Sequence, residues 1–522
     1  MSSNQARQKF ISPESIIKLY SSQGLSKHVK DTFFRWRQQN TSTSGSSSHE
    51  AVDRQKKYCY NRLLELSNRR ADPVGAQFFF DNYQGDRFAP ELRHYNHVIA
   101  AFTKHGDSDT ATTFFHNMKH ASIPPDMSSY NSIILAFSKK RQSHQVEQFI
   151  TRMREQTITP NITTFTALID SYGRAGNIKM AEDAFRKMCH ASVTPDRLTI
   201  NTMVLAHGRA NDVVGAERWF EGIYKYNIQP DIVCFNILLS VFAKGDCELN
   251  EAFVDKWLEK IANANLSPDI FTFNTLIDGF GRRGDVSNAH GTLSKMSAHA
   301  EVKKDIVTFN SLLNAYAKSN DPSGAQAAFD VFFTGVDGLE GIRPDVVTMA
   351  VLVDAHSRVG DSDGALAVVE RMKEIYKIQP NRVVHNAIMS AFARRGESFK
   401  AIHYLRQHDD GRDLVTYNCI IAAFSRQGDG ASAEHWLQVA IDRGLSPDGV
   451  TYHSVLGAYS KTGDTTNAHK VFKKMLRARV RHDIFSINCL LDSHAQCGDV
   501  DGAIDVEKPI VFIKNYAKIH DF

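Results

Sequence analysis

The sequence predicts an all-α fold, a solenoid of about 12 to 13 helical hairpins. An acidic or amide residue, in most cases preceded by proline, recurs along the chain, and we call it the marker of its repeat. The markers are Glu91, Asp126, Asn161, Asp196, Asp231, Asp269, Asp305, Asp345, Asn381, Asp413, Asp448 and Asp483. Successive markers are 35, 35, 35, 35, 38, 36, 40, 36, 32, 35 and 35 residues apart. Such a period over most of 522 residues is typical of a solenoid rather than of three or four globular domains.

The pattern inside each repeat predicts two helices. Apolar side chains recur at helical spacing in the first dozen residues, as at Ile270, Phe273 and Ile277, and a polar turn follows. A second helical stretch comes next, as shown by Ala181 and Phe185. The proline before the marker cannot continue a helix and holds the preceding residue extended, so the second helix ends there. Each repeat is therefore a helix-turn-helix unit.

We number the positions of a repeat from the residue after the previous marker. The repeats begin near residues 57, 92, 127, 162, 197, 232, 270, 306, 346, 382, 414, 449 and 484, and the array spans 57–506. The tail, 507–522, diverges from the pattern and is compatible with a capping helix or a truncated C-terminus. Position 20 is alanine in nearly every repeat, which predicts close packing of helices: Ala76, Ala111, Ala181, Ala216, Ala289, Ala325, Ala365, Ala401, Ala433, Ala468 and Ala503.

Residues 1–56 precede the array. The first 50 residues hold seven Lys and Arg and three acids, with a basic amphipathic stretch at 25–37 and a Ser/Thr-rich segment at 41–48. This composition is compatible with a mitochondrial transit region and equally with a frayed extension that contains one helix. The seven cysteines are scattered without a C-x-x-C pair, which argues against a disulfide framework and a zinc site and indicates a reducing compartment.

The bulk composition does not by itself select a partner. A net charge of +4 gives no reason to expect a polyanion, and no apolar run approaches the ~18 to 20 residues of a membrane span. The sequence shows no phosphate-binding loop and no metal-binding motif, so no catalytic residue, metal or cofactor is expected.

Two positions carry side chains that suggest a repeated ligand. Position 5 is asparagine in ten repeats, although asparagine is a poor helix former, so a hydrogen-bonding role is expected. These residues are Asn61, Asn96, Asn131, Asn201, Asn236, Asn274, Asn310, Asn386, Asn418 and Asn488, and Thr166, Ala350 and His453 occupy the position elsewhere. The alternatives are a helix cap or a bond between repeats.

Position 13 is basic in twelve successive repeats, and we call these residues the cation column. They are Arg69, Lys104, Lys139, Arg174, Arg209, Lys244, Arg282, Lys318, Arg358, Arg394, Arg426 and Lys461, and Gln496 ends the series. A cation at a helix C-terminus is also favoured by the helix dipole. An unbroken series of one cation per repeat nevertheless matches the spacing of a phosphate backbone, so phosphate contact is predicted.

The chain resembles the pentatricopeptide repeat family, in its P-class form. The resemblance rests on the 35-residue period, the strings 305–313 and 413–418 (DIVTFNSLL and DLVTYN), and the closing marker. It implies a right-handed α-α superhelix whose first helices line a concave groove that binds single-stranded RNA. It also implies that position 5 and the closing marker read one base, and that position 2 lies between successive bases. The second-position side chains are Leu198, Val233, Phe271, Val307, Val347, Val383, Val415, Val450 and Phe485. Arg93, Ser128 and Thr163 hold this position in earlier repeats, so weaker stacking is expected there.

The family's base preferences imply a U-rich site. Asn61 with Glu91 implies a pyrimidine, Asn131 with Asn161 implies cytosine or uracil, and Thr166 with Asp196 implies guanine. Each remaining pair of asparagine with a closing aspartate implies uracil. Ala350 with Asn381 and His453 with Asp483 have no assignment. The expected site is Y-U-Y-G-U-U-U-U-N-U-U-N, read 5′ to 3′ from the N-terminal repeat.

The resemblance therefore implies a sequence-specific adaptor of organellar RNA, expected in mitochondria, with plastid or cytosol as alternatives. Its role would be RNA processing, RNA stability, translation or maturation of small-subunit ribosomal RNA. A processing enzyme or the ribosomal small subunit would be its partners. The alternative is a protein-binding α-solenoid scaffold of the tetratricopeptide kind. After residue 506 only about 16 residues remain, too few for a catalytic domain, so an enzyme is not expected.

Overall fold

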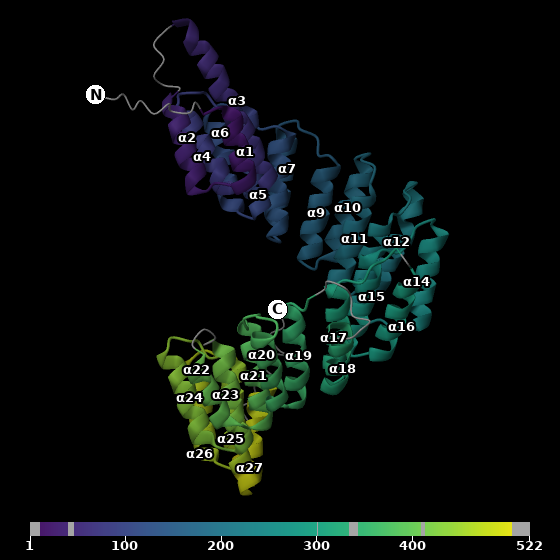
Figure 1. Ribbon diagram of the computed structural model, residues 1–522, viewed down its shortest axis with the longest axis vertical. Coiled ribbons are helices and arrows are strands. Elements are labelled where there is room, and N and C mark those ends of the chain that lie inside the picture. The colour runs from purple at the N-terminus through teal and green to yellow at the C-terminus, as the bar shows by residue number, and fades with distance from the viewer. Residues whose placement is uncertain (1–10, 40–45, 300, 334–342, 409–412, 504–522) are drawn as a thin grey trace, which may run out of the picture. The chain divides into compact units, whose positions relative to one another are not determined.

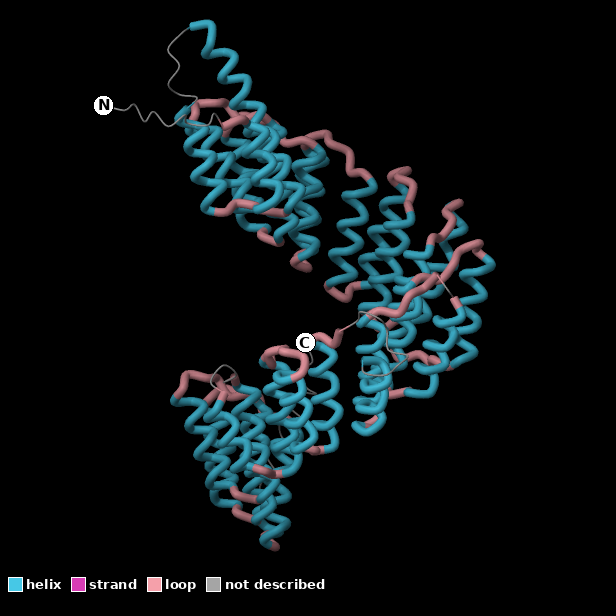
Figure 2. Tube along the Cα trace, in the orientation of Figure 1, coloured by secondary structure: helices cyan, strands magenta, loops and turns pink. Residues whose placement is uncertain are grey.

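A computed structural model describes residues 11–39, 46–299, 301–333, 343–408 and 413–503, and within these ranges the regular elements are helices joined by short loops (Figures 1 and 2). The chain divides into two compact parts. We call residues 1–247 the N-terminal body and residues 248–522 the C-terminal body, and each is described by itself.

The N-terminal body holds two helices before the array and then hairpins in succession. Its helices are α1 (Pro13–Gln23), α2 (Lys27–Gln39), α3 (Ser46–Arg70), α4 (Pro73–Gly85), α5 (Leu92–His105), α6 (Ser108–His120), α7 (Met127–Lys139), α8 (Ser143–Glu155), α9 (Ile162–Arg174), α10 (Ile178–His190), α11 (Arg197–Arg209), α12 (Val213–Glu221), the 3-10 helix η1 (Gly222–Tyr226) and α13 (Ile232–Lys244).

The C-terminal body continues the alternation of first and second helices. Its helices are α14 (Glu251–Asn263), α15 (Ile270–Arg283), α16 (Val286–Ala298), α17 (Ile306–Lys318), α18 (Pro322–Phe333), α19 (Val346–Val359), α20 (Ser362–Glu374), α21 (Arg382–Arg395), α22 (Ser398–Gln407), α23 (Leu414–Gln427), α24 (Gly430–Asp442), α25 (Gly449–Thr462), α26 (Thr465–Arg477) and α27 (Ile484–Cys497). The predicted all-α solenoid of helix-turn-helix repeats is confirmed.

The markers begin the first helices. Every marker from Asp126 to Asp483 is the N-cap residue of a first helix, and its side chain accepts a hydrogen bond from the backbone N–H three residues later. Such a cap is worth about 1 kcal/mol, so the recurring acid or amide fixes where each first helix starts.

The repeats stack through their first helices. Within each body, first helices of consecutive repeats pack side by side, and the second helices other than α14 pack against their own first helix and the next one. The position-20 alanines from Ala76 to Ala468 are fully buried, which confirms the predicted close packing. A small side chain there lets helices approach without a cavity.

The N-terminal segment is more structured than a frayed extension with one helix, and that expectation was wrong. Two helices, α1 and α2, precede the array, and Phe33 of α2 packs edge-on against the rings of Tyr60 and Phe79. Tyr20 of α1 donates to the carboxylate of Asp72 at 2.8 Å. The basic amphipathic stretch therefore buries its apolar face on the first hairpin. Most of the Ser/Thr-rich segment lies outside the described residues.

The two ends of the array also differ from the expected bounds. Helix α3 begins at Ser46, eleven residues before the expected start of the first repeat at Lys57. The last repeat has its first helix, α27, while its second half beyond residue 503 and the tail 507–522 lie outside the described residues. Within the described ranges, no helix combines the length and the apolar character needed to cross a membrane.

Candidate nucleic-acid interface

In several repeats the position-5 asparagine contacts the marker that closes its own repeat. The Nδ2 atom of Asn96 donates to Oδ1 of Asp126 at 3.1 Å, and Asn274 donates to Asp305 at 3.1 Å. The same contact recurs in other repeats, from Asn131 to Asn161 at 3.2 Å, Asn386 to Asp413 at 3.2 Å, Asn418 to Asp448 at 3.4 Å and Asn310 to Asp345 at 3.5 Å. The structure thus brings together two positions about one repeat apart in sequence, so that they form one hydrogen-bonding unit.

Repeat length does not break this pairing. The repeat 382–413 has only 32 residues, yet Asn386 and Asp413 are still bonded. In the 40-residue repeat 306–345, the contact between Asn310 and Asp345 lengthens to 3.5 Å. The marker therefore stays beside position 5 because it caps the next first helix, whatever the length of the intervening second helix.

The position-5 side chains are less exposed than the sequence predicted. Most of them are half-buried, and Asn488 is exposed. Thr166 and Asn201 are buried, with 9% and 7% of their surface exposed. The prediction that position 5 is exposed is therefore wrong for these two repeats. The Thr166 hydroxyl bonds the Thr199 hydroxyl at 3.0 Å, whereas the marker Asp196 is exposed.

Position 3 of the next repeat supplies a second partner that the sequence analysis missed. The Ser129 hydroxyl lies 2.6 Å from Oδ1 of Asn96, and the Thr308 hydroxyl lies 2.6 Å from Oδ1 of Asn274. Three further pairs have this contact: Thr164 with Asn131 at 2.6 Å, Thr451 with Asn418 at 2.7 Å and Thr416 with Asn386 at 3.2 Å. A Ser or Thr three residues after the marker is a capping-box signature, and it can be recognised in the sequence.

The second-position side chains form a column of exposed apolar groups. Their exposed fractions lie between 50% and 68%, and the residues are Leu198, Val233, Phe271, Val307, Val347, Val383, Val415, Val450 and Phe485. An isolated exposed valine is ordinary, but exposure at the same position in nine successive repeats is a regular apolar surface. Such a surface suits flat ligands that stack.

Most side chains of the cation column are exposed, but several of them form ion pairs with acids. Arg174 binds Asp170 of its own helix at 2.6 Å, and Arg209 of the next repeat binds the same carboxylate at 3.0 Å. Other members have an acid four residues earlier: Arg69 with Glu65, Arg282 with Asp278 and Arg358 with Asp354. The i, i+4 spacing of these acids was visible in the sequence and was missed.

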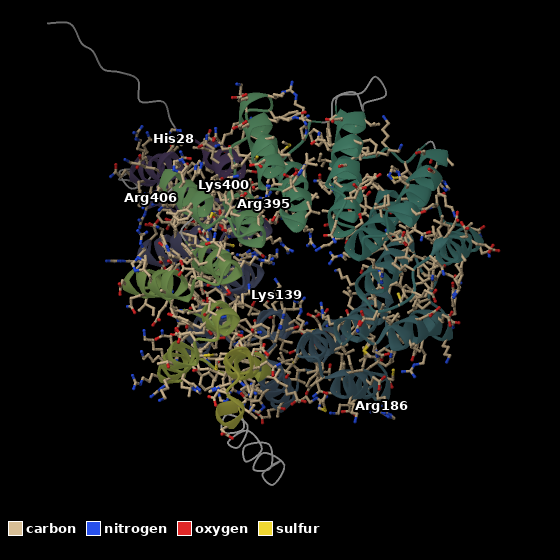
Figure 3. All side chains as sticks on the ribbon, turned by 90° about the horizontal axis from the view of Figure 1, so that it is seen from below. His28, Lys139, Arg186, Arg395, Lys400 and Arg406 are labelled. Carbon is tan, nitrogen blue, oxygen red and sulfur yellow. The ribbon has the colours of Figure 1, made fainter. Side chains whose placement is uncertain are left out.

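A second group of these cations binds helix ends across repeats. Lys104 donates to the Asn68 carbonyl at 2.9 Å, Lys139 to that of Thr103 at 3.2 Å, Arg394 to that of Arg358 at 3.3 Å and Lys461 to that of Ser425 at 3.0 Å. The capping alternative is therefore realised, although the capped carbonyl belongs to the preceding first helix. In Figure 3, Lys139 of α7 lies near the middle of the view and Arg186 of α10 at its lower edge.

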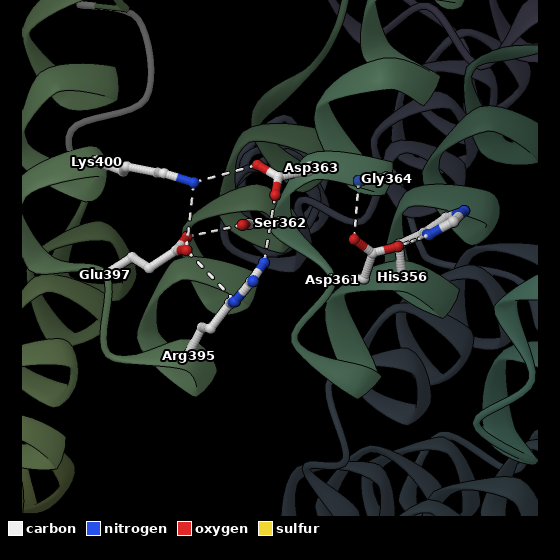
Figure 4. A network of polar contacts seen from close by, with 8 residues as sticks. All are labelled: His356, Asp361, Ser362, Asp363, Gly364, Arg395, Glu397 and Lys400. Carbon is white, nitrogen blue, oxygen red and sulfur yellow. Dashed lines mark hydrogen bonds and ion pairs between the residues drawn. The ribbon is translucent and has the colours of Figure 1, made fainter.

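The remaining members have free charges. Within the described part of the chain, the side chains of Lys244, Lys318 and Arg426 form no hydrogen bond or ion pair, and all three are exposed. The neighbouring position 14 behaves differently (Figure 4): Arg395 binds Glu397 at 3.4 Å and Asp363 at 3.3 Å. At position 13, Lys244, Lys318 and Arg426 are therefore available to a ligand. At position 14, the charge of Arg395 is neutralised by two carboxylates.

Several aspartate markers are held as carboxylates. Burial raises the pKa of Asp126, but hydrogen bonds from Ser129 and the Asn96 amide outweigh burial and lower the pKa below its ordinary value. The same balance lowers the pKa of Asp231, Asp345, Asp413 and Asp448. At neutral pH these groups can accept hydrogen bonds but cannot donate them.

Position 1 adds cations that the sequence analysis did not single out. Arg197 binds the marker Asp231 at 2.8 Å, and Arg382 lies 3.9 Å from the marker Asp413. Among the described residues, no group of three His, Cys, Asp or Glu side chains is placed to hold a metal ion. The chemistry offered by this face is hydrogen bonding, stacking and charge.

Family models match at several places along the chain. The pentatricopeptide repeat domain model matches 339–395, and the PPR repeat family model matches 90–139, 125–174, 160–209 and 412–461. One PPR repeat model matches 264–297, and a second PPR repeat model matches 307–331 and 450–480. Together these matches span more than half of the chain. A comparison with curated proteins gave no match.

Solved structures of repeat proteins are similar in fold. The pentatricopeptide repeat protein PPR10 from maize is 20% identical, with a TM-score of 0.52 over 96% of this chain and 78% of that one. The same protein in complex with an 18-nucleotide psaJ RNA element gives a TM-score of 0.43 at 19% identity, over 95% and 84%. Yeast Rmd9p in complex with a 16-nucleotide target RNA gives 0.38 at 12% identity, over 78% and 88%.

Proposed function

Because the chain belongs to the pentatricopeptide repeat family, we propose that it binds single-stranded RNA, one base to each hairpin. Reading of one base per helical repeat by two or three side chains is an established mode of RNA recognition. The described face of first helices offers the groups that this mode needs, once per repeat.

The observation that carries the proposal is the contact between position 5 and its marker. Asn96 with Asp126 and Asn274 with Asp305 each present an amide and a carboxylate together, half-buried at the edge of a first helix. A bare helix cap needs only the marker. The recurring amide adds a second hydrogen-bonding group beside the marker, which fits a ligand whose bases repeat in the same register.

The other columns supply sequence-independent binding. Exposed apolar side chains such as Phe271 and Val307 would stack on bases, a contact worth about 1 to 3 kcal/mol for an aromatic side chain. Unpaired cations such as Lys318 and Arg426 would contact phosphates, which makes affinity depend on salt. In the repeats with buried Thr166 and Asn201, the exposed marker Asp196 and the half-buried Asp231 would carry more of the readout.

The target we propose is U-rich, of the form Y-U-Y-G-U-U-U-U-N-U-U-N. Asparagine with a closing aspartate supports uracil, and Thr166 with Asp196 supports guanine. We further propose a role as a non-catalytic adaptor in mitochondrial RNA processing, stability, translation or small-subunit ribosomal RNA maturation. The basic N-terminal composition supports this location, although α2 also packs on the array through Phe33 and Trp36. Imaging of the full chain with a C-terminal tag tests the location, and a cytosolic signal would contradict it.

The phosphate contacts are tested by removing four cations together. Replacing Lys318, Arg358, Arg394 and Arg426 with alanine should weaken binding to all RNA sequences alike and flatten the salt dependence measured by filter binding. The expected change in the log-log slope is up to about 0.7 per lost contact on a single strand. An unchanged slope would rule out phosphate contact by this column.

A matched control removes four acid-paired cations from the same body. Arg371, Arg395, Lys400 and Lys474 bind Asp330, Asp363, Glu397 and Glu434 in ion pairs, so their replacement changes the net charge equally. This control should leave the slope nearly unchanged. If neither variant binds RNA less tightly, while the chain binds a peptide through the same face, the protein-binding scaffold replaces our proposal.

A further inference from the structure

We propose that, wherever it bonds the asparagine of the repeat before it, the side chain at position 3 positions that base-reading amide and so sets discrimination between uracil and cytosine. The inference rests on the proposed RNA binding and assigns a role to residues outside the reading pair. Its central example is Thr308, which stands at position 3 of the repeat 306–345 but bonds Asn274 of the repeat 270–305.

The geometry gives the amide one donor contact and one acceptor contact. Asn274 donates through Nδ2 to Asp305 at 3.1 Å, and the Thr308 hydroxyl approaches Oδ1 of Asn274 at 2.6 Å. A carboxylate can only accept, so the NH2 group of the amide must face Asp305. The carbonyl oxygen must then face the hydroxyl, and the amide is held in one of its two near-isosteric orientations.

Fixing this orientation matters because pyrimidines differ in polarity at their base edge. Cytosine presents an amino donor where uracil presents a carbonyl acceptor. An amide free to rotate by half a turn can exchange its donor and acceptor and satisfy either base. An amide pinned at both ends presents the same remaining hydrogen and lone pair to every base, so it discriminates between them.

A different side chain, from the second repeat, fills the same role for the amide of the first repeat. His94, at position 3, is buried, and its Nδ1 accepts the backbone N–H of Glu91 at 2.8 Å. The ring must therefore donate through Nε2, which lies 2.6 Å from Oδ1 of Asn61. Imidazole and hydroxyl thus make the same pair of contacts, one to the marker backbone and one to the preceding amide.

The exception in the chain follows the same rule. Ala350 is the one apolar residue at position 5, and the next position 3 is Val384, the one aliphatic residue in that column. Where no amide needs a partner, the polar donor is missing as well. Capping alone does not explain why a hydroxyl recurs at position 3. Asn381 still caps its helix without one, because it accepts the backbone N–H of Val384 at 3.1 Å.

One repeat separates capping from positioning and provides a matched control. Thr348 is fully buried and makes the same three contacts with Asp345 that Thr308 makes with Asp305, each at 2.8 to 3.2 Å. Oδ1 of Asn310, however, is buried and accepts no hydrogen bond within the described residues. Thr348→Val and Thr308→Val therefore lose the same cap, but only Thr308→Val loses an amide contact.

The experiment measures binding of the full chain to four RNAs that differ only at the nucleotide opposite the repeat 270–305. Thr308→Val should lower the preference for uracil over cytosine at that nucleotide by about three- to tenfold, the effect of losing one net hydrogen bond. Preference for pyrimidine over purine, and the reading of the nucleotide opposite 306–345, should not change. Thr308→Ser should restore the preference, and Thr348→Val should leave the reading opposite its preceding repeat unchanged.

A pair of variants at Ala350 and Val384 tests whether adding the amide and its partner creates discrimination between the pyrimidines. Ala350→Asn alone should discriminate weakly between the pyrimidines, and Ala350→Asn with Val384→Thr should discriminate at least about threefold better. If Thr308→Val weakens all RNAs equally, or the double variant equals the single one, position 3 is only a cap and the inference is overturned. Absence of any RNA binding by the unmodified chain would instead overturn the proposed function and this inference with it.

Discussion

The Asp126 side chain serves two tasks with one carboxylate. It caps α7 through the backbone N–H of Ser129, and it accepts the amide of Asn96. The sequence gives no distance between Asn96 and Asp126, so it does not show that one carboxylate makes both contacts. In the structure, the carboxylate that caps α7 also lies beside the amide of Asn96.

The reading pair of the repeat 162–196 can be converted. Thr166→Asn should move the preference at its nucleotide from guanine towards uracil, because an amide would then stand beside Asp196 and the Thr199 hydroxyl. The discrimination expected is ~1 to 3 kcal/mol, the scale of one base contact. Selection from randomised RNA checks it, and the flanking nucleotides serve as the internal control. An unchanged preference at this nucleotide would show that the register is wrong.

His94 makes the stability of the N-terminal body depend on pH. Burial, together with Arg93, lowers the pKa of His94 from 6.5 to about 4. Because the folded-state pKa lies below the unfolded-state value, stability from the neutral ring is complete above pH 6.5 and is lost as pH falls towards 4. The loss should reach roughly 3 kcal/mol. Denaturant unfolding of the chain and of His94→Thr at pH 7 and pH 4.5 checks it: the variant should lose less stability on acidification, and an equal loss would contradict the assignment.

At the scale of helices, the sequence predicted the fold well and the site only in part. The spacing of the markers located the start of each first helix because a cap depends on residues a few positions apart. The contact of position 3 with the preceding amide was missed because it joins side chains one repeat apart, whereas the acid partners of the cations lie one helical turn away and could have been recognised in the sequence. Thr308 reads as a β-branched capping residue until Asn274 is placed beside it.

The cation column should act unevenly along the array. Arg426→Ala removes a charge without a partner, so it should reduce the salt slope of RNA binding by about 0.7. Arg358→Ala removes a charge already held by Asp354 at 2.7 Å and should reduce the slope less. Filter binding over a range of salt concentrations compares the two single variants. Equal slopes would mean that Arg358 leaves Asp354 to reach the phosphate.

For the chain as a whole, the array needs a covered end. A repeat contacts only its neighbours, so the first hairpin of a solenoid requires a different element on its outer face. The helices α1 and α2 supply it, with Ile16, Val29 and Trp36 fully buried. Sequence periodicity did not predict this cap because α1 and α2 do not follow the 35-residue pattern.

The cap should contribute measurably to stability. Phe33 is fully buried against Tyr60, Phe78 and Phe79, so Phe33→Ala should lower the free energy of unfolding by about 3 to 5 kcal/mol. Its neighbour Phe34 is 41% exposed, and Phe34→Ala should cost less. Guanidinium unfolding compares the two variants, and equal costs would show that α2 does not pack on the array in solution.

The most direct test of base-by-base reading is selection by the full chain from a pool of randomised single-stranded RNA. The account predicts enrichment of one U-rich sequence about twelve nucleotides long, with guanine at the fourth position and little preference at the ninth and twelfth. Thr166→Asn should change the fourth position alone. Recovery of RNAs with no common sequence, or of a sequence that Thr166→Asn leaves intact, would contradict the account.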